Sequence, residues 1–249
     1  MSQGADAAGA LPFALYLFDV DGTLVHAGGA GRRAFERALV DRCGHTGPAP
    51  ALQGLRLDGM TDRLIARTAL ELLGLPFDEA FCDGVLERYV EHLHAEIEGP
   101  GYAVLPGVLP LLDALRARGG LVGLCTGNVV EGARLKLRRG GLDRYFEWSA
   151  SAVFGFAADG EEREKLVLAA LRRAAARLGR PVPPRSAVVV GDTPRDVAAA
   201  HHAGCVALGV ATGRYSQDEL RACGADHVAP ALDHPDALGV LLGRPARSP

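Results

Sequence analysis

Four short apolar segments, each ending in a polar or glycine-rich turn, constrain the fold of this chain more than any other feature. They span residues 14–18, 121–125, 187–190 and 205–210, and a weaker one spans 148–154. Their continuous apolar character is typical of strands that are covered on both faces. Helical patterns separate them, over 108–117, 130–139, 166–178, 194–203 and 217–223. This alternation predicts an α/β fold with a parallel sheet.

One stretch interrupts the alternation. Between residues 31 and 101 only helix-like patterns occur, over 32–43, 61–73 and 77–97, with proline and glycine between them. The sequence therefore predicts a helical insert that covers the strand ends. We expect an α/β core of 13–27 and 103–243, a helical cap of 28–102, a flexible N-terminus of 1–12 and a tail of 244–249.

Composition and charge exclude several classes of protein. The 249 residues carry a net charge of −3 and their arginines are spread along the chain, so no basic groove for nucleic acid is expected. No apolar run reaches the ~18 residues that suggest a membrane span, and no signal-peptide pattern begins the chain. The five cysteines form no Cys-x-x-Cys pair, which suits a reducing compartment. We expect a cytoplasmic monomer or homodimer.

The strongest chemical motif follows the first predicted strand. Asp19 and Asp21 stand two residues apart in Asp-Val-Asp-Gly-Thr, and such carboxylates would repel each other without a compensating charge. A divalent cation supplies that charge, and oxygen ligands suit Mg²⁺. An isolated Asp-x-Asp-Gly is better explained as a strand end, so the interpretation depends on the rest of the chain.

A second acidic pair strengthens this interpretation. Asp192 and Asp196 lie in Gly-Asp-Thr-Pro-Arg-Asp, after another apolar segment and at the start of a helix. Capping explains part of the pattern, with Asp192 or Thr193 as N-cap and Pro194 in the first turn. It does not explain a second acidic strand end at the sheet edge where ligands bind in such folds.

Two weaker features could serve a phosphate group. Thr126, Gly127 and Asn128 offer a hydroxyl and main-chain N–H groups where a helix begins, although Thr-Gly-Asn is also ordinary turn chemistry. Arg163 or Lys165 offers a cation near the start of a later helix. Taken alone, that charged run would be a solvated helix face.

In their order and spacing, these motifs resemble the haloacid dehalogenase (HAD) superfamily, and most of all its phosphoglycolate phosphatase-like branch. The resemblance extends from residue 15 to about residue 228, with the helical insert where this branch carries its cap. It implies a Rossmann-like, doubly wound parallel sheet with an inserted C1-type cap. It also implies an Mg²⁺-dependent phosphatase that hydrolyses a small phosphorylated metabolite, phosphoglycolate-like or a sugar phosphate.

The resemblance implies a role for each acidic residue. Asp19 would be the nucleophile that forms an aspartyl-phosphate. Asp21 would protonate the leaving oxygen and then deprotonate the attacking water. Mg²⁺ would be held by Asp19, the main-chain carbonyl of Asp21, and Asp192, with Asp196 as a ligand or as support for one.

By the same resemblance, Thr126, Gly127 and Asn128 would bind phosphate oxygens, and a basic residue would offset negative charge. The family's usual lysine is commonly followed by proline, whereas leucine follows Lys165. The spacing to the last acidic motif favours Lys165, while the pattern around Arg163 resembles relatives that use arginine. We favour Lys165 and keep Arg163 as the alternative.

Substrate choice is expected to reside in the insert. Thr61, Asp62 and Arg63 begin a helix that could face the core, where Arg63 would bind a substrate carboxylate or second phosphate. Helix capping and a surface arginine explain the same pattern. His26, where this branch often has aspartate, is a further candidate.

Two alternatives to a phosphatase stay open. A sugar phosphate mutase of the β-phosphoglucomutase type uses the same core residues. A non-catalytic nucleotide-binding module is suggested by Gly-x-Gly-x-x-Ala at 29–34, but this pattern lies well beyond the strand end, so a hinge explains it better. Asp21 argues against dehalogenation, and the lack of lysine between residues 25 and 105 argues against Schiff-base chemistry.

Overall fold

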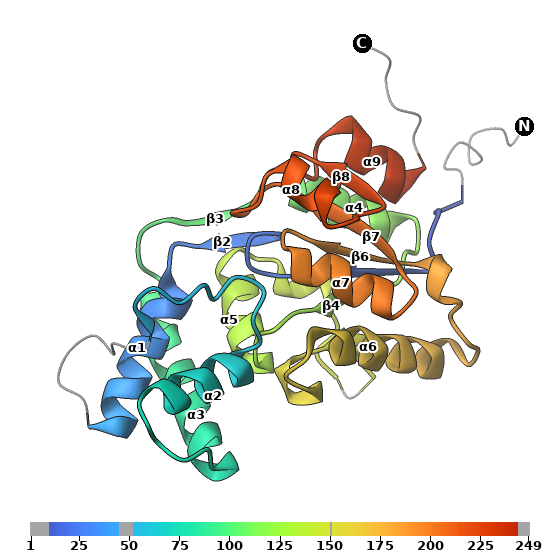
Figure 1. The fold of residues 1–249 in the computed structure, drawn as a ribbon. Helices are drawn as coiled ribbons and strands as arrows, with labels where there is room; N and C mark the ends of the chain where they lie inside the picture. Colours follow the sequence, from blue (N-terminus) through green and yellow to red (C-terminus); the bar gives the residue numbers. More distant parts are fainter. Residues whose placement is uncertain (1–9, 45–51, 150, 244–249) are drawn as a thin grey trace, which may run out of the picture.

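The computed structural model describes residues 10–44, 52–149 and 151–243 (Figure 1). The predicted loose ends therefore lie outside the described residues, except for residues 10–12. The described strands are β1 (Leu15–Phe18), β2 (Val25–Ala27), β3 (Tyr102–Val104), β4 (Val122–Cys125), β5 (Phe154–Gly155), β6 (Ala187–Gly191), β7 (Val206–Val210) and β8 (His227–Ala229).

The described α-helices are α1 (Ala30–Cys43), α2 (Asp62–Leu72), α3 (Glu79–Glu96), α4 (Val108–Ala117), α5 (Val130–Arg139), α6 (Arg163–Leu178), α7 (Pro194–His202), α8 (Gln217–Ala222) and α9 (Pro235–Leu242). Short 3₁₀ turns are η2 (Asp143–Tyr145), η3 (Ala157–Asp159) and η4 (Pro184–Ser186).

Six strands form one sheet in the order β5-β4-β1-β6-β7-β8, and every pair in it is parallel. The predicted doubly wound α/β core is therefore confirmed. Phe18, the last residue of β1, is in register with Leu124 of β4 and Val190 of β6. Strands β4 and β6 extend one residue further, so the segments that follow these three strands begin within one residue of the same level.

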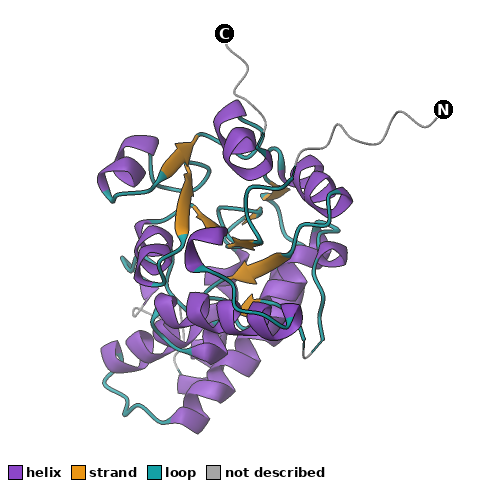
Figure 2. Ribbon diagram, turned by 90° about the vertical axis from the view of Figure 1, so that its right-hand side faces the viewer, coloured by secondary structure: helices purple, strands orange, loops and turns teal. Residues whose placement is uncertain are grey.

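Alternate side chains of β1 explain why helices cover both faces of the sheet. Leu15 and Leu17 pack into a cluster with residues of α6 and α7, whereas Tyr16 and Phe18 pack with residues of α4, α5 and α9. Successive side chains of a strand point to opposite faces, so a continuous apolar strand requires a helical layer on each side. Figure 2 shows the strands between helices on either side.

Helices α1, α2 and α3 lie between β2 and β3 in the chain and gather at one end of the molecule (Figure 1). They have an apolar cluster of their own, in which the rings of Phe35 and Tyr89 stack with centroids 4.3 Å apart. The antiparallel pair β2–β3 joins this helical cap to the core. The predicted insert is thus present, and its boundaries at residues 28 and 102 stay a prediction.

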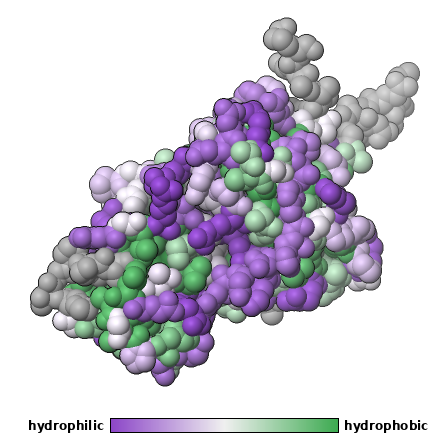
Figure 3. All heavy atoms as spheres, in the orientation of Figure 1, coloured by the Kyte–Doolittle hydropathy of each residue, from purple (hydrophilic) through white to green (hydrophobic). Residues whose placement is uncertain are grey.

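The face drawn in Figure 3 is largely hydrophilic over the core, and hydrophobic residues gather over the cap. Among the described helices, none combines the length and the hydropathy needed to cross a bilayer.

The main differences from the predicted elements concern short or charged segments. Strands β2, β3 and β8 have three residues each, too few for an apolar pattern to stand out, and only the end of the predicted 148–154 segment forms β5. Helix α6 begins at Arg163 rather than at residue 166, because its first turn carries charges instead of apolar periodicity. Helix α9 was not predicted.

Candidate active site

The predicted motifs meet at the carboxyl edge of the sheet. Asp19 follows β1, Thr126 follows β4 and Asp192 follows β6, and these strands are neighbours in the order β4-β1-β6. A cavity of about 550 Å³ lies there, lined by the three residues and by residues of the cap. Segments far apart in the sequence therefore form one site.

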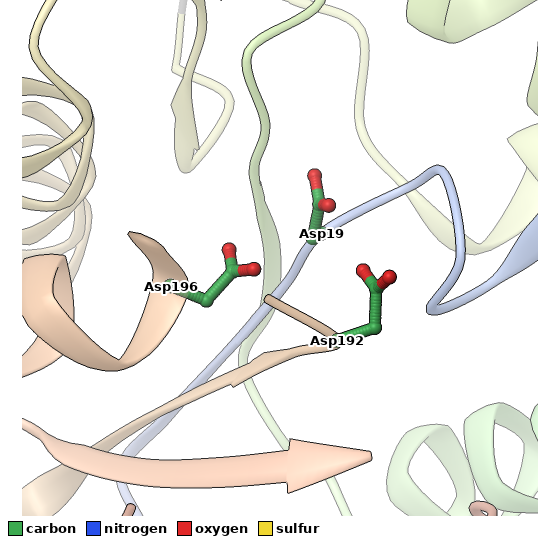
Figure 4. A group of neighbouring side chains, drawn as sticks. All are labelled: Asp19, Asp192 and Asp196. Atoms are coloured by element: carbon green, nitrogen blue, oxygen red, sulfur yellow. The ribbon is translucent and has the colours of Figure 1, made fainter. Parts of the chain in front are cut away.

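Asp19, Asp192 and Asp196 form a buried acidic group beside this cavity (Figure 4). One carboxylate oxygen from each lies within 4.8 Å of those of the other two. Their exposed fractions are only 2–5%. Asp19 and Asp192 come from the loops after β1 and β6, and Asp196 comes from the first turn of α7.

Two glycines allow Asp192 to approach. Gly22 has a φ of 79°, and a Cβ atom there would lie 2.3 Å from Asp192 Oδ2. A Cβ atom at Gly213 would lie 1.8 Å from the same oxygen. Any side chain at either position would displace the carboxylate, which explains the glycine that follows Asp21 in the first motif.

Arg163 is the cation that joins the acidic group. Its Nη2 lies 2.8 Å from Asp19 Oδ1 and 2.5 Å from Asp196 Oδ1, as ion-pair contacts rather than well-directed hydrogen bonds. Its Nε donates to Asp196 Oδ1 at 2.7 Å. Asp196 Oδ2 accepts hydrogen bonds from the main-chain N–H and the hydroxyl of Thr193, which is the N-cap of α7. Both oxygens of Asp196 are thus engaged in holding Arg163 and the helix start.

Lys165, which the spacing favoured, lies elsewhere. Its ammonium pairs with Glu162 at 2.5 Å, and its side chain is 55% exposed. Arg163 opens α6 and points inward, whereas Lys165 lies two residues further along the helix. Because residues two apart do not share a helix face, only one of the two can reach Asp19. Of the two candidates, Arg163 is therefore the one that contacts Asp19, contrary to the preference for Lys165.

Burial raises the pKa values of the acidic group. For Asp19, desolvation outweighs the attraction of Arg163, and with the repulsion of Asp196 and Asp21 it raises the pKa to about 6. Desolvation, joined by repulsion from Asp19 and Asp196, also raises the pKa of Asp192 well above its ordinary value. The charged forms are thus costly here, and a further cation at the site would stabilise them.

Asp21 also lines the cavity, and one oxygen of its carboxylate accepts two hydrogen bonds. Its Oδ2 accepts hydrogen bonds from Lys136 Nζ at 2.6 Å and from Asn128 Nδ2 at 2.9 Å. The Asn128 amide also donates to Thr126 Oγ1 at 2.8 Å and accepts from Lys136 Nζ at 2.6 Å. The side chain of Asn128 therefore supports its neighbours. Thr126 and Gly127 line the cavity, and Asn128 is not among its lining residues.

The N-terminus of α2 fastens the cap to the core. The main-chain N–H of Asp62 donates to Gly127 O at 2.7 Å, and its Oδ2 accepts from the main-chain N–H of Val129, the N-cap of α5, at 2.7 Å. Thr61 caps α2, and its hydroxyl donates to Glu161 O at 3.1 Å. Thr61 is not among the cavity-lining residues, whereas Asp62 lines the cavity with one oxygen already engaged.

The other predicted substrate contacts differ in position. Arg63 pairs with Glu79 and Asp83 of α3 and is not among the residues that line the cavity, so the structure does not support it as a substrate contact. His26 does line the cavity, and its Nδ1 accepts the main-chain N–H of Gly28 at 3.2 Å.

The sequence did not point to Lys136, Arg56 or Arg214 as site residues. Lys136 lies on the buried side of α5. The one signal for it in the sequence was the rarity of lysine, which accounts for two of the 27 basic residues. Arg56 and Arg214 line the cavity from the cap and from the loop after β7. Nothing in the local sequence separates them from surface arginines.

Comparisons with known proteins identify the family. The haloacid dehalogenase-like hydrolase family matches residues 13–204. A phosphoglycolate phosphatase of Rhodospirillum rubrum is 32% identical over 92% of this chain and 90% of its own, and one of Agrobacterium fabrum is 29% identical over 80% and 81%. The solved structure of CbbY from Rhodobacter sphaeroides in complex with phosphate superposes with a TM-score of 0.68 at 21% identity, over 92% of this chain and 99% of its own.

The chain therefore belongs to the haloacid dehalogenase-like hydrolases. Its fold is that of a family member with a C1-type helical cap. Within the family it is an enzyme of the phosphoric monoester hydrolase class.

A pH-dependent stability test follows from Asp62. Burial, opposed by Lys136 and by the Val129 N–H, raises the pKa of Asp62 to about 7 from an ordinary value of 3.8. The contribution of this group to the free energy of unfolding is fully present below the ordinary pKa and is lost as the pH rises through about 7. The reason is that the folded state binds the proton more tightly than the unfolded state does. We expect Asp62→Asn to remove that loss, since asparagine stays neutral and keeps an acceptor for Val129.

Urea unfolding at pH 5, 6, 7 and 8 measures this effect. The free energy of unfolding of Asp62→Asn, relative to wild type, should increase with pH, by up to a few kcal/mol. Asp58→Asn changes an exposed residue four positions before Asp62. This variant should show the same dependence of the free energy of unfolding on pH as wild type. Parallel curves for wild type and Asp62→Asn would contradict the assignment.

Proposed function

We propose that this enzyme is an Mg²⁺-dependent phosphatase for a small phosphate monoester with a second anionic group, such as phosphoglycolate, and that it acts through a phosphoryl group on Asp19. One observation carries the proposal. The buried carboxylate of Asp19 lines the cavity, is held by Arg163 at 2.8 Å, and lies beside Asp192. Relatives that include the phosphoglycolate phosphatases of Rhodospirillum rubrum and Agrobacterium fabrum support the substrate class.

The donor set of the acidic group fits Mg²⁺. The group offers carboxylate oxygens, the ligand type that this ion prefers. Because both oxygens of Asp196 are engaged by Arg163 and Thr193, we assign the holding of the ion to Asp19 and Asp192 and give Asp196 a supporting role. Bound there, Mg²⁺ would offset negative charge on the phosphoryl oxygens and on the carboxylates.

The residues of the chain divide the chemistry between them. A carboxylate oxygen of Asp19 attacks phosphorus, the bond to the leaving oxygen breaks, and Asp21 gives its proton to that oxygen. Asp21 then takes a proton from water as the water oxygen attacks phosphorus, which breaks the bond to Asp19 and releases phosphate. Thr126 and Gly127 bind phosphoryl oxygens, and Arg163 neutralises charge that accumulates there.

Two arginines at the cavity suit a second anionic group. Arg56 of the cap and Arg214 of the core are exposed, line the cavity and pair with no carboxylate in the described part of the chain. Both also lie near Glu219, whose pKa is held low mainly by Ser216 and in smaller part by these arginines. Glu219 itself is occupied in capping α8 at Ser216. The two guanidinium groups are therefore available to a substrate carboxylate.

The nucleophile is tested with Asp19→Asn. We expect its kcat for p-nitrophenyl phosphate with Mg²⁺ to fall at least ~10³-fold, because an amide cannot form the phosphorylated intermediate. Thermal unfolding of the variant serves as the control for folding. Turnover at the wild-type rate would refute the assignment.

The basic position is tested by the same change at two sites. Arg163→Met should lower kcat by about 10²–10³-fold, because it removes the cation beside Asp19. Lys165→Met should keep wild-type kcat, since among the described residues this ammonium pairs only with the exposed Glu162. The reverse ranking would restore Lys165 as the catalytic cation.

The second-anion contact is tested with Arg56→Gln and Arg214→Gln. Each should raise KM for phosphoglycolate about tenfold, the loss expected for one partly exposed charge-assisted contact. Neither should change KM for p-nitrophenyl phosphate, which lacks a second anionic group. Arg63→Gln is the matched control, since Arg63 pairs with Glu79 and Asp83 away from the cavity. An equal rise for both substrates would argue against a specific anion site.

A further inference from the structure

We propose that Lys136 is a positioning residue of this enzyme, which fixes the carboxylate of Asp21 for proton transfer to the leaving group. The proposal rests on the function above and extends it to a residue outside the expected motifs. Arg163 contacts Asp19 and Asp196, whereas Lys136 is a second cation of the site and contacts Asp21.

The contacts of Lys136 set the orientation of Asp21. Its side chain extends from α5, is only 5% exposed, and places Nζ 2.6 Å from Asp21 Oδ2. Asn128 Nδ2 donates to the same oxygen at 2.9 Å, and Asn128 Oδ1 is itself held by Lys136 Nζ at 2.6 Å. Oδ1 of Asp21 accepts no hydrogen bond from the described residues. One oxygen is thus fixed, and the other is left for a reacting group.

Lys136 acts through Asp21 and not on the substrate directly. Asp21 lines the cavity and its side chain is 43% exposed, whereas Lys136 is not among the lining residues. Two charge-assisted contacts from a buried ammonium and its amide partner restrict the rotation of the carboxylate. An acid that is already oriented loses less entropy when the leaving oxygen arrives, which is the advantage of a positioned proton donor.

Stability alone does not account for a lysine at this place. Burying an ammonium costs several kcal/mol unless its partners compensate, and apolar residues of similar volume often stabilise a fold equally well. Burial alone would lower the pKa of Lys136, but interactions led by the negative charge of Asp21 outweigh it and raise the pKa. We therefore relate the buried ammonium of Lys136 to the carboxylate of Asp21.

The surroundings of Lys136 connect it with the cap. Tyr89 of α3 and Asp62 of α2 both lie near enough to the ammonium to influence its pKa. Asp62 is also the residue that binds the main chain at Gly127 and Val129. Helices α2 and α3 thus enclose the ammonium from the cap side, while Asp21 and Asn128 bind it from the core side.

The two lysines of the chain allow a matched test, Lys136→Met against Lys165→Met. For each variant and wild type, kcat/KM is measured with p-nitrophenyl phosphate and with an alkyl phosphate that wild type hydrolyses, phosphoglycolate first. An alkoxide leaves poorly and needs the proton from Asp21, whereas p-nitrophenolate leaves with little help. Because kcat/KM covers the steps up to the first phosphoryl transfer, the pair of substrates isolates the proton donation.

We expect Lys136→Met to lower kcat/KM for the alkyl phosphate about 10–100-fold more than for p-nitrophenyl phosphate. Lys165→Met should leave both values at the wild-type level. Equal losses for the two substrates with Lys136→Met would show a merely structural role and overturn the proposal, as would no loss. A wild-type protein inactive on both esters would instead refute the proposed function itself.

A second variant covers the case in which Lys136→Met does not fold, as judged by far-UV circular dichroism. Lys136→Ala is then assayed with and without propylammonium, whose ammonium and short chain replace the removed part of lysine. Recovery of kcat/KM for the alkyl phosphate of at least fivefold, with no recovery by propanol, supports the proposal. Recovery by both compounds would indicate cavity filling and contradict it, as would recovery by neither in a folded variant.

Discussion

Carboxylates at the ends of neighbouring parallel strands repel one another, and the rest of the site must offset this repulsion. Asp19 and Asp192 follow the neighbouring strands β1 and β6, and burial makes their charged forms costly. Few cations are available to compensate. Arg163 serves Asp19 and Asp196, Lys136 serves Asp21, and a bound cation would offset the negative charge that remains.

The positions of these cations follow from the helices that cover the sheet. Helix α6 packs on β1, β4 and β5, so the first residue of α6 enters the site from one face of the sheet. Helix α5 packs against the opposite face and against α3 of the cap, so Lys136 reaches Asp21 from the other side. Two layers of helices are needed to bury a continuous apolar sheet, and each layer supplies one cation.

Much of this arrangement could be predicted from the sequence, because continuous apolar strands and acidic strand ends are local patterns. The choice between Arg163 and Lys165 could not, since it depends on where α6 begins, and its charged first turn has no apolar periodicity. The place of Lys136 beside Asp21 could not be predicted either, although the rarity of lysine marked the residue. Its distance from Asp21 depends on the packing of α5 against the sheet and α3, and a lysine on a helix is usually a solvated residue.

The cap has a role in the electrostatics as well as in covering the site. Main-chain atoms of Met60 and Thr61 lie so near Gly127 that a Cβ atom there would be 2.3 Å from Met60 O. This close approach brings the Asp62 carboxylate to the N-terminus of α5 and near the Lys136 ammonium. Displacing the cap would expose both charges to water, where Coulombic interactions are several times weaker. Cap closure and the charge balance around Asp21 are therefore physically coupled through the same few residues.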